Sequence, residues 1–304
     1  MGDSSAETRP ASKAGISVIV RTLGTPQLAD ALESLAGQTR RDFELVFVDM
    51  SDGRAERTLC QVASRLPAVR VLSLKKPVSR PRALNLGIAA SGSPRIGILD
   101  EDNIYDPPHL DRLIGGLEES GADYVYTGVR HATFLPDGQP VESRDVAVPF
   151  RFERVILGNY IYATGSAFSK SLWERIGGYD ERFEVFEDWD FIIRAARHGR
   201  VHHIPIVSGE SRKFTGLVGA SGFDLEIRSA RRCMAGLYWK HRHLFRGDLR
   251  REVKLAAEQH CRRRIPARRG LLARTANGWP VELGLDLVAW WLTRAVDLSR
   301  RKAA

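Results

Sequence analysis

Three consecutive acidic residues near the middle of the chain form the first group that could do chemistry. Asp100, Glu101 and Asp102 directly follow the apolar residues 96–99, so we expect them at the exit of a buried strand. Carboxylates this close raise one another's pKa unless a cation neutralises them, and Mg²⁺ or Mn²⁺ prefers carboxylate and phosphate oxygens. We therefore interpret the run as a site for a divalent cation and a diphosphate. An acidic turn that caps the next helix is the alternative, and the run alone does not decide between them.

Glu187, Asp188 and Asp190 form a second acidic group, at the start of a segment, residues 188–198, that we expect to be helical. A carboxylate beside a bound sugar could act as general base toward an attacking hydroxyl, although capping the helix is the commoner role for an acid here. Side chains two positions apart on a helix project about 200° from one another. Asp190 therefore does not share the role of Asp188, and Glu187 is the second candidate for the base.

The pattern around both groups alternates short β-branched runs with helical segments. In the first hundred residues, strands are expected at 16–20, 43–48, 69–74 and 95–99, with helices at 27–37, 54–66 and 82–90. Further along, helices are expected at 107–118, 170–176 and 188–198, and strands at 124–129, 162–168 and 201–207. Such alternation is typical of an α/β fold with a mostly parallel sheet. Ligands bind at the carboxyl ends of the strands in these sheets, where Arg21, Thr22, Asp49 and the acids at 100–102 are expected.

Length and composition exclude several classes of protein. The 304 residues are 43% hydrophobic and 27% charged, as in an ordinary folded protein and unlike a disordered or collagen-like chain. The cysteines at 60, 233 and 261 have no CxxC spacing, which favours a reducing, cytoplasmic compartment. Residues 1–14 are small and polar, as expected of a mobile tail and not of a signal peptide. No apolar run reaches the roughly 18 residues that a spanning helix requires.

Taken together, these motifs resemble glycosyltransferase family 2. The similarity covers about residues 15–210, and the matching segments occur in the family's usual order: 17–22 (SVIVRT), 32–35, 38–39, 42–45, 48–49, 51–53, 83–88 (ALNLGI), 100–102, 177–180 (GGYD) and 187–190 (EDWD). The resemblance implies that residues 15–225 form a GT-A catalytic domain. In this α/β fold a Rossmann-like, mostly parallel central sheet is flanked by helices.

The resemblance also implies roles for individual residues. Asp102 matches the carboxylate that binds the metal cofactor, Mn²⁺ or Mg²⁺, and Asp188 matches the catalytic base. The positions that match nucleotide-binding residues are Thr22, Asp49, Arg80, Arg82, Asp100 and Glu101.

Three positions depart from the family pattern. Arg21 stands where proline is common, Glu101 where a small residue or aspartate is common, and Leu84 where arginine is common. These departures concern binding of the donor rather than the fold.

The implied activity is the inverting transfer of a sugar from a nucleotide-diphospho-sugar to a carbohydrate or lipid-linked acceptor. The metal at Asp102 would offset the negative charge that grows on the leaving diphosphate. Asp188 would accept the proton of the acceptor hydroxyl as that hydroxyl attacks the anomeric carbon from the opposite face.

The C-terminal quarter of the chain differs from the rest in charge. Residues 1–227 hold 27 Lys and Arg against 31 Asp and Glu, whereas residues 228–304 hold 19 against 6. We expect residues 226–304 to form a basic helical extension, with helices at 228–245, 249–264 and 279–298, the last amphipathic and containing tryptophan.

Two hypotheses explain this extension. Anionic lipids attract arginine and tryptophan settles at the headgroups, which favours peripheral contact with the inner face of the cytoplasmic membrane. The other hypothesis is packing on the catalytic domain or on a second copy in a homo-oligomer. Nucleic acid is not an expected partner, because the arginines at 262–264 and 268–269 lack interleaved aromatic residues.

Two other functions compete with sugar transfer. A nucleotidyltransferase shares a similar α/β core and acidic metal site, but would carry a glycine-rich, basic phosphate loop near its N-terminus, and residues 21–25 (RTLGT) match one poorly. A non-catalytic module that binds a sugar nucleotide or a membrane would retain its function without Asp188.

Overall fold

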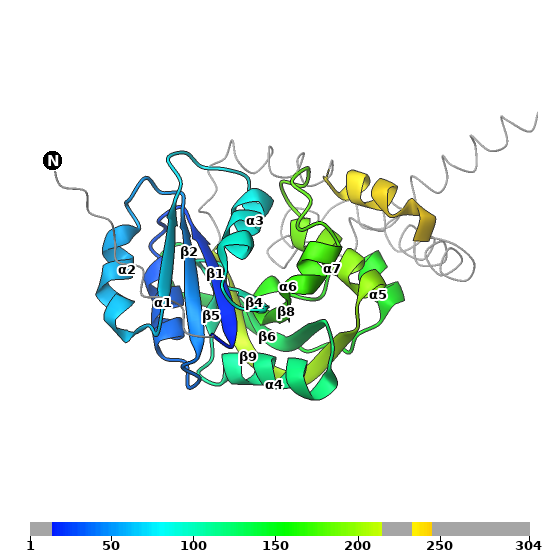
Figure 1. Ribbon diagram of the computed structural model, residues 1–304, viewed down its shortest axis with the longest axis horizontal. Helices are drawn as coiled ribbons and strands as arrows, with labels where there is room; N and C mark the ends of the chain where they lie inside the picture. Colours follow the sequence, from blue (N-terminus) through cyan, green and yellow to red (C-terminus); the bar gives the residue numbers. More distant parts are fainter. Residues whose placement is uncertain (1–13, 215–232, 245–304) are drawn as a thin grey trace, which may run out of the picture. The chain divides into compact units, whose positions relative to one another are not determined.

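The computed structural model describes residues 14–214 and 233–244 (Figure 1). The chain divides into two compact units. Within the described ranges, the first unit consists of residues 14–150 and 160–214, and the second of residues 151–159 and 233–244.

The amino-terminal half of the first unit contains four parallel strands. These are β1 (Ile16–Thr22), β2 (Phe43–Asp49), β3 (Val69–Ser73) and β4 (Arg95–Ile98), in the order β3-β2-β1-β4. Every residue of β1 and β2 is buried, as expected of central strands that are covered on both faces. The expectation of an α/β fold with parallel strands is confirmed.

Helices cover both faces of these strands (Figure 1). Helices α1 (Leu28–Ala36) and α2 (Glu56–Val62) contribute leucines to the core on the side of Val18 and Val20. Helix α3 (Arg80–Ala90) packs on the other side, where the backbone of Gly87 lies against Ile19. Successive side chains of a strand point to opposite faces, so β1 alone supplies residues to both layers.

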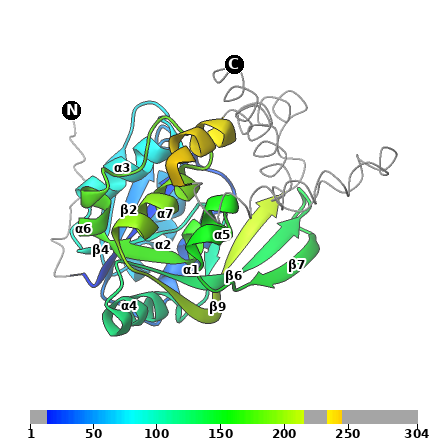
Figure 2. The same ribbon diagram turned by 90° about the vertical axis from the view of Figure 1, so that its right-hand side faces the viewer.

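The rest of the sheet mixes directions. Beyond β4 the order is β8 (Ser166–Ser169), β6 (Tyr124–Phe134), β9 (Val201–Phe214) and β5 (Ile104–Tyr105), and β7 (Pro140–Val146) pairs with β6. Strand β8 is antiparallel to both neighbours. Strands β6 and β9 run parallel and lie side by side (Figure 2). The remaining helices of this unit are α4 (His109–Ser120), α6 (Lys170–Arg175) and α7 (Glu187–His198).

Several elements differ from those expected. The segment expected to be a strand at 162–168 begins as a 3-10 turn, Ala163–Gly165, and only Ser166–Ser169 pairs as β8. The helix expected at 54–66 is α2 followed by a 3-10 turn at Ala63–Arg65. Strand β7 was not predicted because six of its seven residues are exposed, so it has no apolar alternation.

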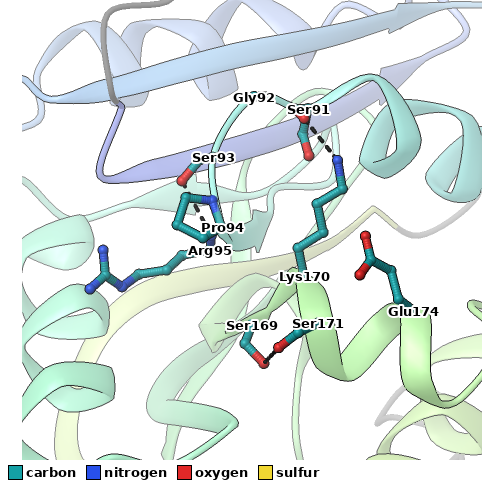
Figure 3. A pocket seen from close by; sticks show the side chains of 9 residues that line it. All are labelled: Ser91, Gly92, Ser93, Pro94, Arg95, Ser169, Lys170, Ser171 and Glu174. Carbon is teal, nitrogen blue, oxygen red and sulfur yellow. Dashed lines mark hydrogen bonds between the residues drawn. The ribbon is translucent and has the colours of Figure 1, made fainter.

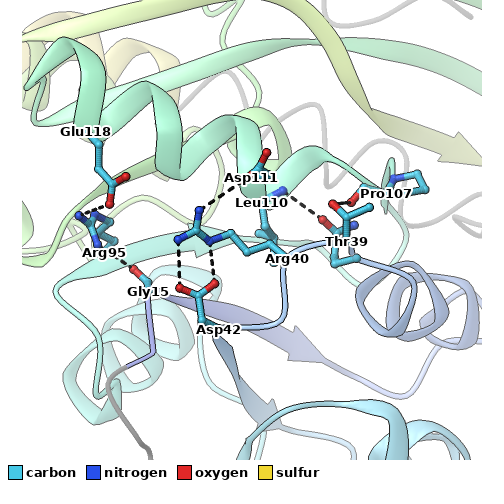
Figure 4. Close-up of polar contacts among 10 residues, drawn as sticks. Gly15, Thr39, Arg40, Asp42, Arg95, Pro107, Leu110, Asp111 and Glu118 are labelled. Carbon is cyan, nitrogen blue, oxygen red and sulfur yellow. Dashed lines mark hydrogen bonds and ion pairs between the residues drawn. The ribbon is translucent and has the colours of Figure 1, made fainter.

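A group of surface ion pairs lies at the amino end of the parallel strands (Figure 4). Arg40 Nε donates to Asp42 Oδ1 at 2.6 Å, and its guanidinium also reaches Asp111 of α4 at 3.3 Å. Arg95 pairs with Glu118 at 2.8 Å and donates to the carbonyl of Gly15. These contacts join α4 to the starts of β1, β2 and β4. The carboxyl ends of the same strands lie at the opposite edge of the sheet.

The described part of the second unit is helical. It contains α5 (Phe152–Leu157), a helical segment at 233–240 and a 3-10 turn at Arg242–Leu244. The Tyr238 hydroxyl donates to the carbonyl of Leu157 at 3.1 Å. Only part of the helix expected at 228–245 is described, and the helices expected at 249–264 and 279–298, with the basic patch, lie outside the described residues. None of the helices in residues 14–214 and 233–244 has the length and apolar content needed to cross a bilayer.

Candidate active site

The carboxyl ends of β1, β2 and β4 lie side by side. In the parallel register Thr22 is opposite Asp49, and Ile19 is opposite Ile98. The residues expected after these strands, Arg21, Thr22, Asp49 and the acids at 100–102, are therefore at one edge of the sheet. Their gathering was predicted from the strand pattern.

Asp100 has a cationic partner that the sequence did not indicate. Arg21 Nη2 donates to Asp100 Oδ1 at 2.7 Å, although the two residues are 79 positions apart. Burial alone would raise the pKa of Asp100, but the guanidinium groups of Arg21 and Arg80 bring that pKa below its usual range. Asp100 is therefore an ionised carboxylate whose charge is compensated by the protein.

The Glu101 carboxylate binds the end of β1 and the loop between β1 and α1. Its Oε2 accepts from the Thr22 hydroxyl at 2.6 Å and from the Thr25 amide at 3.2 Å, and its Oε1 accepts from the Leu23 amide at 3.2 Å. Thr22 Oγ1 in turn accepts from the Gly24 amide at 2.8 Å. Glu101 therefore anchors this loop, and three of its backbone amides are already hydrogen-bonded.

Asp49, at the end of β2, holds the loop that follows it. Its Oδ1 accepts from both the amide and the hydroxyl of Ser51, at 2.7 and 2.5 Å. The Ser51 hydroxyl oxygen accepts from the amide of Ala55, immediately before α2. Asp49 is buried in this network.

Asp102 differs from its two neighbours. In the described part of the chain, no other side chain forms a hydrogen bond or an ion pair with its carboxylate. Asp100 and Glu101, in contrast, both have side-chain partners. Burial and the charge of Asp100 raise the pKa of Asp102 to about 6. Its carboxylate oxygens can therefore accept a cation without first losing a protein partner.

Arg80 connects the two acidic groups. It is the first residue of α3, its side chain is half exposed, and its Nε lies 3.2 Å from Glu187 Oε1. Burial lowers the pKa of Arg80, but the surrounding carboxylates raise it above its usual value. The carboxylates that act on it come from both groups: Glu187, Asp100, Asp188 and Asp102. Two acidic motifs separated by more than eighty residues thus face one guanidinium.

Asp188 lies in the first turn of α7, beside this arginine. Burial and the neighbouring Glu187 raise its pKa to about 7, against the opposing effects of Arg80 and of the Trp189 amide. That amide donates to Asp188 Oδ1 at 2.7 Å. A carboxylate with a pKa near neutrality can accept a proton at physiological pH, as a general base must.

Asp190 points elsewhere, as its position on the helix predicted. It is fully buried and forms an ion pair with Arg194 of the same helix, Oδ2 to Nε, at 2.7 Å. Arg194 also donates to the carbonyl of Ile176. Asp190 therefore fixes α7 to the preceding turn.

Arg82 and Arg80 have different surroundings, although both match nucleotide-binding positions. The Arg82 guanidinium lies 3.4 Å from Glu181 and is largely exposed, while Arg80 faces the acids. Leu84, where the family commonly has arginine, is buried in α3. Arg80 is therefore the cation that α3 presents to the site.

A cavity of about 580 Å³ lies at the other end of β4 (Figure 3). It is lined mainly by serines and by Lys170 and Arg95. Lys170 Nζ donates to the carbonyls of Ala89 and Ser91, and the Ser169 hydroxyl oxygen accepts from the Leu172 amide. These polar groups form hydrogen bonds with the backbone at the end of α3 and the start of α6. None of the predicted site residues lines the cavity.

The strand pattern placed Arg21 at this edge of the sheet, but its ion pair with Asp100 was not predicted. The alignment of parallel strands could have found it, because the residue that follows the buried run 16–20 must lie next to the residue that follows 96–99. Asp100 and Arg21 satisfy that condition. The meeting of Arg80 with Asp188 had no comparable local signal.

Comparison with known proteins decides the family. The model of glycosyl transferase family 2 matches residues 17–173, slightly more than half of the chain. The chain belongs to glycosyltransferase family 2. This result confirms the resemblance of the motifs, and the protein is a glycosyltransferase.

Relatives of this family 2 protein include the uncharacterized glycosyltransferase YwdF of Bacillus subtilis (strain 168). It is 26% identical over 197 residues, which are 64% of this chain and 72% of that protein. A PGL/p-HBAD biosynthesis glycosyltransferase of Mycobacterium bovis (strain BCG / Pasteur 1173P2) is 28% identical over 211 residues, 66% of this chain and 78% of the relative.

Solved structures share the GT-A fold of this family 2 chain. S. aureus TarS 1–349 in complex with UDP-GlcNAc matches with a TM-score of 0.60 at 17% identity, over 80% of this chain and 70% of that one. The mannosyltransferase PcManGT from Pyrobaculum calidifontis, in complex with GDP-Man and Mn²⁺, matches with a TM-score of 0.56 at 18% identity, over 96% and 77% of the two chains. The expected fold class is confirmed.

Proposed function

We propose that this family 2 transferase moves a sugar from a nucleotide-diphospho-sugar to an acceptor hydroxyl with inversion, using Asp188 as general base. The observation that carries the proposal is the meeting of both acidic groups at Arg80. A donor whose diphosphate lies beside Asp102 and Arg80 would place its anomeric carbon near α7. An acceptor hydroxyl on that side would then lie within reach of Asp188.

The nucleotide would bind at the carboxyl ends of β1 and β2. Thr22 and Asp49 are the last residues of these strands, and hydrogen bonds join Thr22 to Glu101 and Asp49 to Ser51. Arg80 offers a guanidinium to the diphosphate, which is a form of contact that stabilises a phosphate strongly. Arg82 is the weaker candidate because it pairs with Glu181.

Asp102 would hold a Mn²⁺ or Mg²⁺ ion together with oxygens of the diphosphate. In the described part of the chain, His, Cys, Asp and Glu side chains form no cluster of three or more that could hold a metal alone. A single carboxylate with a raised pKa still fits a cation whose other ligands come from the donor. When bound, the cation would stabilise the charge on the departing diphosphate.

In the reaction itself, the protein orients the reactants and accepts a proton from the acceptor hydroxyl. Arg80 holds Glu187 and faces Asp188, so the start of α7 is placed beside the donor. Asp188 takes the acceptor's proton as the new bond to the anomeric carbon forms and the bond to the diphosphate breaks. Glu187 keeps its ion pair and remains the second candidate for the base.

We propose an acceptor of the cell envelope, either a carbohydrate or a lipid-linked glycoconjugate. The relatives named for PGL/p-HBAD biosynthesis support this class. The basic C-terminal extension, residues 226–304, would contact anionic lipid at the inner face of the cytoplasmic membrane, and packing on the protein or on a second copy is the alternative. Flotation with anionic vesicles against neutral ones, for the full chain and a chain ending at residue 225, distinguishes the two.

The β1–α1 loop argues against a nucleotidyltransferase. A phosphate-binding loop needs free backbone amides, and in this protein Glu101 and Thr22 already occupy the amides of Leu23, Gly24 and Thr25.

The test of the proposed function is donor binding and hydrolysis with UDP-, GDP- and dTDP-sugars, in Mn²⁺, in Mg²⁺ and in EDTA. We expect one nucleotide class to bind in the presence of the metal and to release its diphosphate. Metal-independent binding of that donor would contradict the role of Asp102.

A further inference from the structure

Asn85, on the side of α3 that faces the turn before α7, uses both ends of its side-chain amide. Its Oδ1 accepts from the Tyr179 amide at 2.8 Å and from Trp173 Nε1 at 3.2 Å. Its Nδ2 donates to the Tyr179 carbonyl at 2.9 Å and to Glu181 Oε1 at 3.1 Å. Four hydrogen bonds are close to the full capacity of an amide side chain. One residue thus fixes both the backbone and the ends of a turn about ninety residues away in sequence.

Gly178 of this turn lies so close to Asn85 that there is no room for a side chain at position 178. Gly177 and Gly178 both have positive φ, 77° and 71°, which favours glycine. A Cβ on Gly178 would lie 2.8 Å from Asn85 Oδ1 and 3.2 Å from Trp173 Nε1. The glycine pair therefore permits the contact that Asn85 makes.

The next residue of the turn transmits this contact to α7. The Tyr179 ring stacks on Phe191 of α7, with centroids 4.3 Å apart and planes 12° from parallel. Both rings are buried, and Phe191 lies three residues after Asp188. Asn85, Tyr179 and Phe191 thus form a continuous packed path from α3 to the first turns of α7.

The start of α7 needs such support. Phe186, immediately before the helix, has φ of 65°, a conformation unfavourable for a bulky residue and one that persists only where the surroundings enforce it. Helix α3 reaches this end of α7 at a second point, through the ion pair of Arg80 with Glu187. The same helix therefore holds α7 through one charged contact and one path of neutral contacts.

We infer that Asn85 is a positioning residue for sugar transfer: by holding the 178–181 turn against α3, it sets the place of Asp188 relative to the donor. This inference rests on the proposed role of Asp188. The donor's own contacts come from the ends of β1, β2 and β4 and from Arg80, none of which Asn85 touches. Loss of Asn85 therefore affects turnover and spares donor binding.

The test compares Asn85→Ala with Gln38→Ala, using release of the nucleoside diphosphate from the UDP-, GDP- or dTDP-sugar that the wild type binds. Gln38 is a matched control, because its buried amide also bridges separate elements: it donates to Ser34 and Asp106 carbonyls and accepts from the Leu110 amide. A displacement of about 1 Å can cost roughly a hundredfold in rate. We expect Asn85→Ala to lower kcat about tenfold to a hundredfold with the donor Kd within about threefold, and Gln38→Ala to change neither beyond about threefold.

A rescue experiment separates positioning from general loss of structure. In Asn85→Asp the Oδ1 contacts remain, but a carboxylate faces the Tyr179 carbonyl and the carboxylate of Glu181. Adding Glu181→Gln supplies an amide that can donate to it, whereas the Tyr179 carbonyl still faces the carboxylate, so we expect the double variant to recover part of the kcat lost by Asn85→Asp. Glu181→Gln alone should keep near-wild-type turnover.

Hydrogen exchange gives a readout that needs no donor. We expect faster exchange over residues 177–190 in Asn85→Ala. In Gln38→Ala we expect faster exchange at Leu110, whose amide donates to Gln38, and no change over residues 177–190. Unchanged exchange over 177–190, or a loss confined to donor Kd, would overturn the role of Asn85. Full turnover in Asp188→Asn would instead overturn the proposed function and leave the turn contact standing.

Discussion

Arg80 Nε lies 3.2 Å from Glu187 Oε1, and through this contact the first residue of α3 meets the first residue of α7. The contact brings the acids at the end of β4 and those at the start of α7 around one cation. A diphosphate that binds at Arg80 would therefore lie near both acidic groups, Asp100–Asp102 and Glu187–Asp188. We therefore propose that donor binding and the placement of the base both depend on Arg80.

Arg80→Ala should weaken donor binding, and Arg82→Ala should not. A lost charge-assisted hydrogen bond costs about 1.5–3 kcal/mol, which corresponds to roughly tenfold to a hundredfold in Kd. Arg82 is the matched control because it lies two positions away on the same helix but pairs with the exposed Glu181 at 3.4 Å. Calorimetric titration with the donor measures the donor Kd of both variants. Equal effects of the two substitutions would show that Arg80 has no special contact with the diphosphate.

Asp188→Asn should stabilise the fold, and more so at high pH. The pKa of Asp188 is about 7 in the fold against 3.8 for an unperturbed aspartate, so ionisation of Asp188 costs stability as pH rises through the window from about 4 to about 7. The neutral amide removes that cost and can still accept from the Trp189 amide. We expect a Tm gain of about 2–6 °C at pH 8 and a smaller gain at pH 4.5.

Thermal melts across this pH range check the stability prediction. Asp111→Asn is the control, since Asp111 lies on the surface beside Arg40 and has no part in the site. Its Tm difference from wild type should not grow with pH. A gain for Asp188→Asn that stayed constant from pH 4.5 to pH 8 would argue against a raised pKa.

Glu101→Ala should loosen the β1–α1 loop. The substitution removes the acceptor of the Thr22 hydroxyl and of the Leu23 and Thr25 amides. Because Thr22 is a proposed nucleotide contact, we expect donor Kd to rise about tenfold, the equivalent of about 1.4 kcal/mol. Limited proteolysis within residues 22–28 should accelerate, whereas Glu118→Ala, which breaks a surface pair with Arg95, should change neither quantity. Unchanged proteolysis in Glu101→Ala would show that the loop does not depend on this carboxylate.

Two glycine substitutions should change stability in opposite directions. A Cβ on Gly87 would lie 2.7 Å from Ile19 Cγ2 and 3.0 Å from Val48 Cγ2, so Gly87→Ala forces α3 away from the sheet and should cost about 1–3 kcal/mol. A Cβ on Gly115 of α4 would meet only the Glu119 carboxylate, at 3.7 Å. Gly115→Ala should therefore gain about 0.5–1 kcal/mol through helix propensity. Urea unfolding of both variants gives the two signs, and destabilisation by Gly115→Ala would contradict the open space seen there.

The local parts of this structure could be predicted from the sequence, because they depend on burial along single segments. Strands β1, β2 and β4 are apolar runs, and their ends locate Thr22, Asp49 and Asp100. Strand β7 has exposed side chains and β5 has two residues, so neither left a periodic signal. The segment at 162–168 has strand-like composition, but its first part closes a turn at Gly165, against Thr127 and Val129.

The contacts that organise the site could not be predicted in the same way. They join residues that are far apart in sequence, such as Arg21 with Asp100 and Arg80 with Glu187. The Arg80–Glu187 pair depends on how α3 and α7 pack, which no local pattern determines, whereas the Arg21–Asp100 pair follows from the parallel pairing of β1 with β4. The assignments of Asp102 and Asp188 came from the family resemblance, and the structure adds the charged environment of both.

Turnover and donor binding in Asp188→Asn test the central claim most directly. With the sugar nucleotide and metal that the wild type uses, we expect wild-type release of the diphosphate to rise with pH and level off above about pH 7, since the base must be ionised. Asp188→Asn should bind the donor within about threefold of wild type and lose at least about a hundredfold in kcat, while Asp111→Asn retains both. A variant Asp188→Asn that binds the donor and turns it over at the wild-type rate would contradict the assignment of Asp188 as the base.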